Sequence, residues 1–294
     1  MLRLIIKDQQ INLIRKDMTL VAAWVRHNNN TKELYVSSDS RLSGGRAWDI
    51  GPKVLDLGRG DSVIAFAGDT NNAYPLMLQL QSAVQMHPKM RSRAFDLTIL
   101  RGYLLSLFNE MWKQITDLPR GQKLPDPAEV KFILAGYSWK TQSFKIWTVY
   151  FDNRENAFKF RSASTHRKKG GGNKYFAFIG DDANLANERV YALLRERNRI
   201  EDIGIHMEPF EVLKEFIFDR QKPYIGGAPQ IFKVYNHLNT KAFNVYWPNK
   251  ESKEITFGGR VLMHFERNEL LAFDPDTFET EKTNWPTTTI NIIE

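Results

Sequence analysis

The sequence predicts an α+β protein built as a four-layer αββα sandwich, in which two antiparallel sheets pack face to face and each sheet carries a layer of helices on its outer side. Two helical stretches follow one group of strand-like runs, and two more follow the next group. Short turns join most neighbouring strands, as in antiparallel hairpins. Residues 18–25 are apolar at odd and even positions, which is typical of a strand buried on both faces.

The first half of the chain is expected to form a hairpin, further strands and two helices. Residues 20–26 and 33–39 flank a polar turn, which predicts an antiparallel hairpin. Short strands are expected over 53–57 and 62–67. Apolar residues at helical spacing then predict one helix that includes Ala73 and Val84 and another over about 96–115.

The second half repeats this order of strands followed by helices. After a proline-containing loop at 119–127, three strands in meander order are expected over 130–137, 144–151 and 157–163. Residues 175–180 predict a strand that turns into a helix, a further helix begins at Pro209, and the last strands are expected over 231–235, 243–247 and 255–262. Because no linker separates these parts, residues 18–294 are expected to form a single domain after a distinct segment at 1–17.

The composition indicates a globular chain and excludes several classes of protein. Hydrophobic residues make up 42% and aromatic residues 12% of the 294, which is enough for a packed core. The absence of cysteine excludes disulfides, thiolate nucleophiles and cysteine-ligated metals. No apolar run approaches the roughly 20 residues that a membrane span requires, and charged residues interrupt residues 1–17. We therefore expect a cytoplasmic protein without a membrane partner.

The charge pattern argues against a nucleic-acid partner, although the net charge is +7. The densest basic cluster, residues 166–169, precedes three glycines, contains no aromatic residue for base stacking and lacks the spacing of a P-loop. We interpret it as a solvated loop. The six histidines are scattered without the spacing of metal ligands, so neither a metal nor another cofactor is expected.

A hydroxyl, a carboxylate, an ammonium and a glycine amide occur in order at Thr19, Asp39, Lys53 and Gly68. A threonine hydroxyl is a poor nucleophile without a base, but a threonine that begins a chain can use its own α-amine, whose ordinary pKa is roughly 7.7–8.0. A nearby lysine would lower that pKa, and an aspartate would hold the lysine in place. A glycine amide would stabilise the oxyanion formed during acyl transfer.

The order of these motifs resembles that of proteasome β-type subunits and their bacterial relatives, which belong to the N-terminal nucleophile hydrolases. The resemblance covers nearly all of residues 18–265 and rests on the Thr19-headed strand, Ser37–Arg41, Pro52–Val54, Ala67–Asp69, the Ile179–Gly180 turn and Gly226–Gly227. It implies that Thr19 is the nucleophile, Asp39 and Lys53 tune the amine, and Gly68 is the oxyanion donor. It also implies peptide or small amide substrates, assembly into a homo-oligomer such as a ring, and an unfoldase partner.

The last part of the resemblance departs from the family pattern. Where the relatives carry a serine, this chain has Asp181, and residues 220–225 contain neither the aspartate nor the serine that orient the amine in those proteins. Asp181 or Asp182 is an alternative acceptor for the amine, although a carboxylate there would raise the pKa of the amine. The sequence favours a threonine-type hydrolase and leaves a catalytically inactive scaffold or regulatory subunit as the alternative.

The segment at 1–17 decides whether the α-amine of Thr19 is free. Three interpretations compete: a propeptide removed by autocleavage, a permanent extension that blocks the amine, or an upstream start codon that is not used. We favour the third, because Met18 directly precedes Thr19 and removal of an initiator methionine would expose the threonine.

Overall fold

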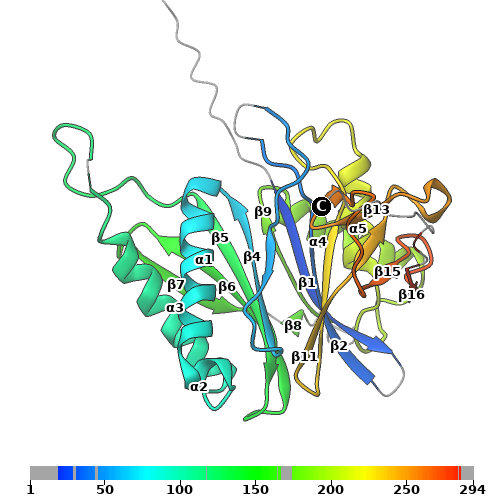
Figure 1. Ribbon diagram of the computed structural model, residues 1–294, viewed down its shortest axis with the longest axis horizontal. Helices are drawn as coiled ribbons and strands as arrows, with labels where there is room; N and C mark the ends of the chain where they lie inside the picture. The colour runs from blue at the N-terminus through cyan, green and yellow to red at the C-terminus, as the bar shows by residue number, and fades with distance from the viewer. Residues whose placement is uncertain are drawn as a thin grey trace, which may run out of the picture.

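The computed structural model describes residues 19–28, 31–43, 46–116, 118–163, 165–166, 174–283 and 285. The segment at 1–17 and most of the basic loop after His166 lie outside these residues, and so do the expectations that concern them. The described chain forms three sheets, and strands take 34% of residues against 26% for helices. Figure 1 shows the sheet that contains β4 beside the sheet that contains β1, with helices on the outer side of each.

The first sheet has the strand order β11-β10-β2-β1-β9-β8. Its strands are β1 (Leu20–Asn28), β2 (Thr31–Ser38), β8 (Thr165–His166), β9 (Lys174–Gly180), β10 (Gln230–Tyr235) and β11 (Asn239–Ala242). The predicted hairpin is confirmed, because β1 pairs antiparallel with β2 and Val21 lies opposite Ser38. On its other side β1 pairs with β9, with Leu20 opposite Gly180.

The second sheet follows chain order, and the predicted meander is confirmed. Its strands are β3 (Val54–Asp56), β4 (Ser62–Gly68), β5 (Val130–Ser138), β6 (Ser143–Asp152) and β7 (Ala157–Ser162). The helices α1 (Thr70–Met86), α2 (Pro88–Arg91) and α3 (Leu97–Trp112) follow β4. The carboxylates of Asp69 and Asp96 cap α1 and α3, which explains where both helices begin.

The two sheets face each other across an apolar cluster that includes Val21, Ala23, Ala65 and Ile133. The alternate residues of β1 face the other way, toward α4 (Ala183–Glu196) and α5 (Glu208–Phe218). The prediction that β1 is buried on both faces is therefore confirmed. Sequence periodicity could indicate this because a strand presents successive side chains to opposite faces.

The predicted four-layer αββα sandwich is wrong. The described residues are richer in strand than in helix and contain a third sheet, ordered β14-β13-β12-β15-β16, beside only five helices. Its strands are β12 (Asn244–Tyr246), β13 (Ile255–Phe257), β14 (Arg260–Val261), β15 (Leu271–Phe273) and β16 (Thr280–Lys282), with a 3-10 turn at Lys250–Ser252.

The third sheet shares the outer face of the first sheet with α4 and α5. Val245 of β12 and Phe273 of β15 belong to the same apolar cluster as Leu213 of α5, and the ring of Phe273 lies 5.1 Å from that of Phe210. The predicted strand over 243–247 corresponds to β12, which lies in the third sheet, whereas β11, which ends at Ala242 in the first sheet, was not predicted.

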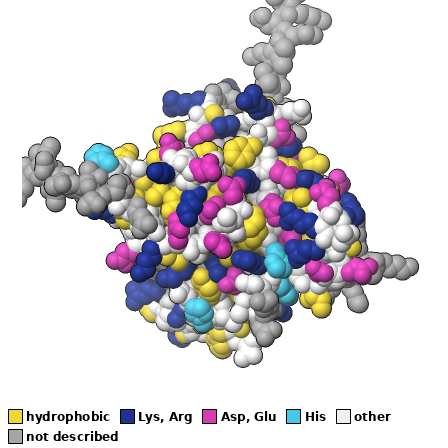
Figure 2. Space-filling model, turned by 90° about the vertical axis from the view of Figure 1, so that its right-hand side faces the viewer, with side chains coloured by type: hydrophobic (Ala, Val, Ile, Leu, Met, Phe, Trp, Pro, Cys, Tyr) yellow, Lys and Arg dark blue, Asp and Glu magenta, His cyan; other side chains and the backbone are white. Residues whose placement is uncertain are grey.

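The surface in Figure 2 carries interspersed charges. Lys and Arg side chains alternate with Asp and Glu side chains over this face, without one contiguous basic area. A nucleic-acid interface usually gathers its cations into a patch or stripe. In the described residues no helix has the length and the apolar character that crossing a bilayer would require.

Candidate active site

Thr19, Asp39 and Lys53 meet where the first and second sheets come together. The Lys53 ammonium donates to Thr19 Oγ1 over 2.8 Å, and its Nζ lies 3.0 and 3.1 Å from the two carboxylate oxygens of Asp39. All three side chains are buried, and Asp39 has no exposed surface. A single ammonium therefore joins the predicted nucleophile to the predicted carboxylate.

The hairpin of β1 and β2 places the hydroxyl beside the carboxylate. Thr19 directly precedes β1 and Asp39 directly follows β2, so the register that pairs Val21 with Ser38 brings both residues to the same end of the hairpin. The amide of Leu20 donates to Asp39 Oδ1 over 3.2 Å. Lys53 directly precedes β3, so its side chain extends from the second sheet to the first.

The Asp39 carboxylate accepts hydrogen bonds from several directions. Its Oδ2 accepts from the amides of Arg41 at 3.2 Å and Gly226 at 3.3 Å. Burial raises the pKa of Asp39, while Lys53 and the amides of Gly226 and Leu20 act in the opposite direction. These donors can stabilise a buried negative charge that would otherwise be costly.

Gln230 fixes the backbone beneath Lys53, and sequence reasoning missed it. Its Oε1 accepts from the amide of Lys53 at 2.9 Å and that of Val54 at 3.3 Å, while its Nε2 donates to the carbonyl of Gly51 at 2.5 Å. Gln230 is buried on β10, so it ties the first sheet to the start of β3. No signal in the sequence could reveal this contact, because 177 residues separate Gln230 from Lys53.

Gly68 and Gly180 are required by the backbone at two strand ends. Gly68 has φ +112°, and a Cβ there would lie 2.2 Å from the carbonyl oxygen of Glu129. Gly180 has φ +119°, and a Cβ there would lie 1.8 Å from the carbonyl oxygen of Thr19. Both positions favour glycine for steric reasons. The role of the Gly68 amide as oxyanion donor stays a prediction.

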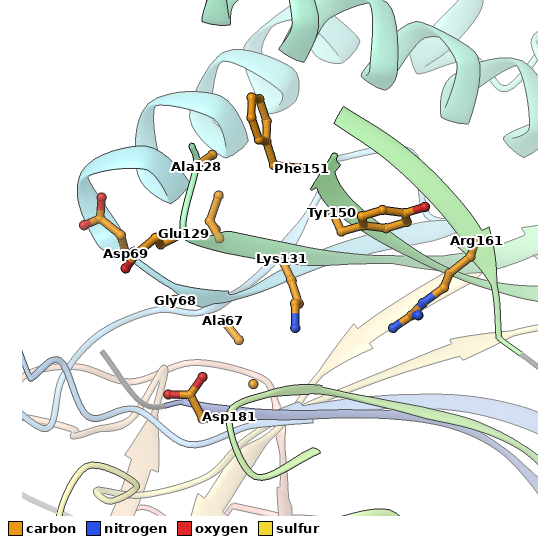
Figure 3. A pocket seen from close by; sticks show the side chains of 12 residues that line it. Ala67, Gly68, Asp69, Ala128, Glu129, Lys131, Tyr150, Phe151, Arg161 and Asp181 are labelled. Carbon is orange, nitrogen blue, oxygen red and sulfur yellow. The ribbon is translucent and has the colours of Figure 1, made fainter. Parts of the chain in front are cut away.

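The two aspartates in the turn after β9, Asp181 and Asp182, have different surroundings. The Asp182 carboxylate accepts from the Lys222 ammonium over 2.7 Å. Lys222 lies in segment 220–225, which lacks the aspartate and serine expected from the resemblance. Asp181 lines a cavity of about 490 Å³ together with Gly68 and Gly180. Figure 3 shows Asp181 across this cavity from Gly68.

The five predicted site residues therefore form two groups. Thr19, Asp39 and Lys53 are in direct contact. Gly68 and Asp181 line the neighbouring cavity, which approaches Thr19 through Gly180. Besides Gln230, sequence reasoning missed the contact of the Gly226 amide with Asp39. The paired glycines mark a turn, but they do not indicate which carboxylate that turn approaches.

Comparison with known proteins gives no family for this chain. No protein-family model matches it, and no curated protein matches its sequence. Among the side chains that the structure describes, no three His, Asp or Glu residues are grouped so that they could hold a metal ion. The chemistry of the site is therefore inferred from its own geometry.

Proposed function

We propose that the chain is an N-terminal-threonine amidohydrolase that cleaves peptide or small amide bonds once the α-amine of Thr19 is exposed. The observation that carries this proposal is the position of the Lys53 ammonium, 2.8 Å from Thr19 Oγ1 and 3.0 Å from Asp39. A lysine that is buried against a threonine hydroxyl and held by a carboxylate is an arrangement that activates a nucleophile. The resemblance of the motif order to proteasome β-type subunits supports the same proposal.

In this mechanism the Thr19 hydroxyl attacks the amide carbonyl while its own α-amine takes the hydroxyl proton. The tetrahedral intermediate then collapses, the protonated amine gives its proton to the leaving nitrogen, and an ester on Thr19 remains. Water activated by the same amine hydrolyses that ester and regenerates the hydroxyl. The amine thus acts as base and acid in turn.

Lys53 and Asp39 would support these steps through charge. The ammonium would stabilise the developing alkoxide and disfavour a second positive charge on the neighbouring amine, so that the amine is neutral near pH 7. Asp39 would keep the ammonium charged and aimed at the hydroxyl. The Gly68 amide would donate to the oxyanion.

The test begins with intact-mass measurement and N-terminal sequencing of untagged protein purified from its own host. We expect a chain that begins at Thr19 and hydrolyses fluorogenic peptide amides. Thr19→Ala should remove the hydrolysis, whereas Thr19→Ser, which keeps a hydroxyl beside an α-amine, should retain part of it. Full hydrolysis by Thr19→Ala would overturn the proposal.

A second candidate function is an inactive scaffold or regulatory subunit of the same kind of assembly. The ion pair of Asp182 with Lys222 favours it, because that pair engages a carboxylate that would otherwise be available to the α-amine. On this alternative the purified chain retains residues 1–18 and hydrolyses nothing. Intact mass therefore separates the two candidates before any substrate is known.

The resemblance also extends the proposal to the cellular setting. We propose a cytoplasmic protein that assembles into a homo-oligomer, such as a ring, and receives substrates from an unfoldase. The mass of the native particle, measured by light scattering, tests the assembly. A strictly monomeric particle would remove the ring and leave the chemistry of Thr19 to be tested by itself.

A further inference from the structure

The cavity that Gly68, Gly180 and Asp181 line lies where the inner face of the second sheet changes from apolar to charged. Residues that alternate along a strand share a face, so Lys131 lies on the same face of β5 as Ile133 and Ala135. Those two residues pack in the cluster between the sheets, whereas Lys131 lines the cavity. Hydrophobic residues therefore fill the space between the sheets up to this end, where a cavity replaces them.

Three side chains on this face form a cationic and aromatic wall. Lys131 lies opposite Tyr150 of β6, and Arg161 lies opposite Thr148 of β6. The Arg161 guanidinium lies 5.7 Å from the centre of the Tyr150 ring. Figure 3 shows the side chains of Lys131 and Arg161 directed into the cavity from neighbouring parts of the sheet.

Lys131 and Arg161 differ from Lys159, a third cation, which lies on β7 with Arg161. Lys159 lies two residues before Arg161 on β7 and pairs with Asp152 at 3.4 Å and with Glu155. Among the residues that the structure describes, neither Lys131 nor Arg161 has a carboxylate within ion-pair distance. The cavity thus presents two positive charges that are available to a ligand.

The acidic groups of the cavity lie toward its other end. Asp69 caps α1, accepting from the amide of Asn71 at 3.0 Å and from the side chain of Asn72 at 2.7 Å. Figure 3 shows Glu129 beside Asp69, and Asp181 on the opposite wall near Gly68. The cavity therefore has carboxylates near Gly68 and cations at Lys131 and Arg161, with apolar residues such as Val130 and Phe151 in the same lining.

We propose that Lys131 and Arg161 bind a carboxylate of the substrate, so that the enzyme selects acidic peptides or amides. This inference rests on the proposed function for its catalytic meaning, because Gly180, which lines the cavity, lies opposite Leu20, the residue after the proposed nucleophile. Arg161 of β7 supplies a planar donor set suited to a carboxylate, and Lys131 supplies a second charge from β5, on the other side of β6. The Tyr150 ring lies within cation–π distance of the guanidinium, at 5.7 Å from its centre.

The carboxylate has two sources, an acidic side chain or the free carboxyl end of a peptide. Three probes distinguish them: acetyl-Ala-Ala-Glu-amide, acetyl-Ala-Ala-Gln-amide and acetyl-Ala-Ala-Gln with a free carboxyl end. Binding is measured by calorimetry in the Thr19→Ala variant of the full chain, where turnover does not interfere. We expect at least one acidic probe to bind about 10-fold more tightly than the neutral probe, in line with a charge-assisted contact.

The double variant Lys131→Ala/Arg161→Ala should reduce the preference for the acidic probe to less than about threefold. The double variant Lys131→Glu/Arg161→Glu should reverse it, so that a probe with lysine in place of the glutamate binds more tightly than the acidic probe. Lys159→Ala is the matched control, because its charge is already paired, and it should keep the preference. Thermal unfolding of each variant shows that the fold is retained.

Equal binding of acidic and neutral probes, binding of none of them, or a preference that survives the double variant would overturn the inference. Since binding is measured without turnover, these outcomes are distinct from failure of the proposed function, which appears as an absence of Thr19-dependent hydrolysis in the unsubstituted protein.

Discussion

Two fully buried ion pairs of this chain have the same charges and different surroundings. Lys53 pairs with Asp39 at 3.0 Å, and Arg59 pairs with Asp61 at 2.8 Å, with almost no solvent exposure in either pair. The Arg59 guanidinium binds both oxygens of Asp61 and also donates to the carbonyl of Phe95 over 2.8 Å. It joins the start of β4 to the segment before α3.

The difference lies in the third partner of each cation. Arg59 donates to a main-chain carbonyl, which is an inert acceptor, so its hydrogen bonds stabilise the arrangement of the chain. Lys53 donates to a hydroxyl, a group whose own reactivity depends on the charge beside it. Burial and pairing are alike in the two pairs, so the proposed difference in their roles depends on the other groups that each cation contacts.

Exchanging the cation at the Thr19 site should produce the largest effect. In Lys53→Arg the charge opposite Asp39 remains, but a guanidinium cannot reproduce the compact ammonium beside Thr19 Oγ1. We expect Thr19-dependent hydrolysis to fall by about 10²–10⁴-fold, equivalent to about 3–5 kcal/mol in the transition state. Steady-state kinetics measure the loss, circular dichroism checks the fold, and activity within threefold of the unsubstituted protein would contradict the comparison.

The reciprocal exchange, Arg59→Lys, should act on stability instead. A lysine cannot supply the planar fork to Asp61 and the bond to Phe95 together, so the free energy of unfolding should fall by about 1–3 kcal/mol. The kcat of the proposed Thr19-dependent hydrolysis should stay within about twofold, since Arg59 does not contact Thr19. Denaturant unfolding provides the measurement, with Lys113→Ala, which removes an exposed ion pair, as a control that should not shift the midpoint. A drop in kcat as large as that of Lys53→Arg would make the two pairs equivalent.

Replacing Asp96 should produce the smallest effect, and one that depends on pH, because this buried carboxylate is held by hydrogen bonds and pairs with no cation among the described residues. Burial raises the pKa of Asp96, but hydrogen bonds from Thr98, Lys140 and Ser138 lower it by more, so that the pKa lies below its ordinary value. The ionised form is therefore favoured in the folded state. This stabilisation is complete above the unfolded pKa of about 3.9 and is lost as the pH falls through the folded pKa.

Removing that carboxylate with Asp96→Ala should reduce the free energy of unfolding by about 1–2 kcal/mol at pH 7, because α3 loses its cap and Ser138 loses its acceptor. The difference from the unsubstituted protein should shrink as the pH is lowered toward 3. Urea unfolding at several pH values measures it, and a difference that does not change with pH would show that the charge of Asp96 contributes nothing.

The elements that the sequence predicted well are long and periodic. β1, β5 and β6 are strands of nine or ten residues, and α1 and α3 are helices of 17 and 16 residues, each with a clear apolar pattern. The order of Thr19, Asp39 and Lys53 could likewise be read from one hairpin and the strand that follows it. In each case the signal lies within a short stretch of chain, where local periodicity and turn chemistry determine the structure.

Only the tertiary structure determined the rest. Strands were predicted where β12 and β13 lie, but β15 and β16 have three residues each, too few to show a period, so the third sheet and its share of the outer layer could not be foreseen. Gln230 beneath Lys53 and the Gly226 amide on Asp39 come from positions more than 170 residues away. The cavity with Lys131 and Arg161 exists because the sheets stop packing at one end. Contacts of this kind depend on how strands and helices pack against one another in three dimensions. Local sequence patterns do not encode that packing.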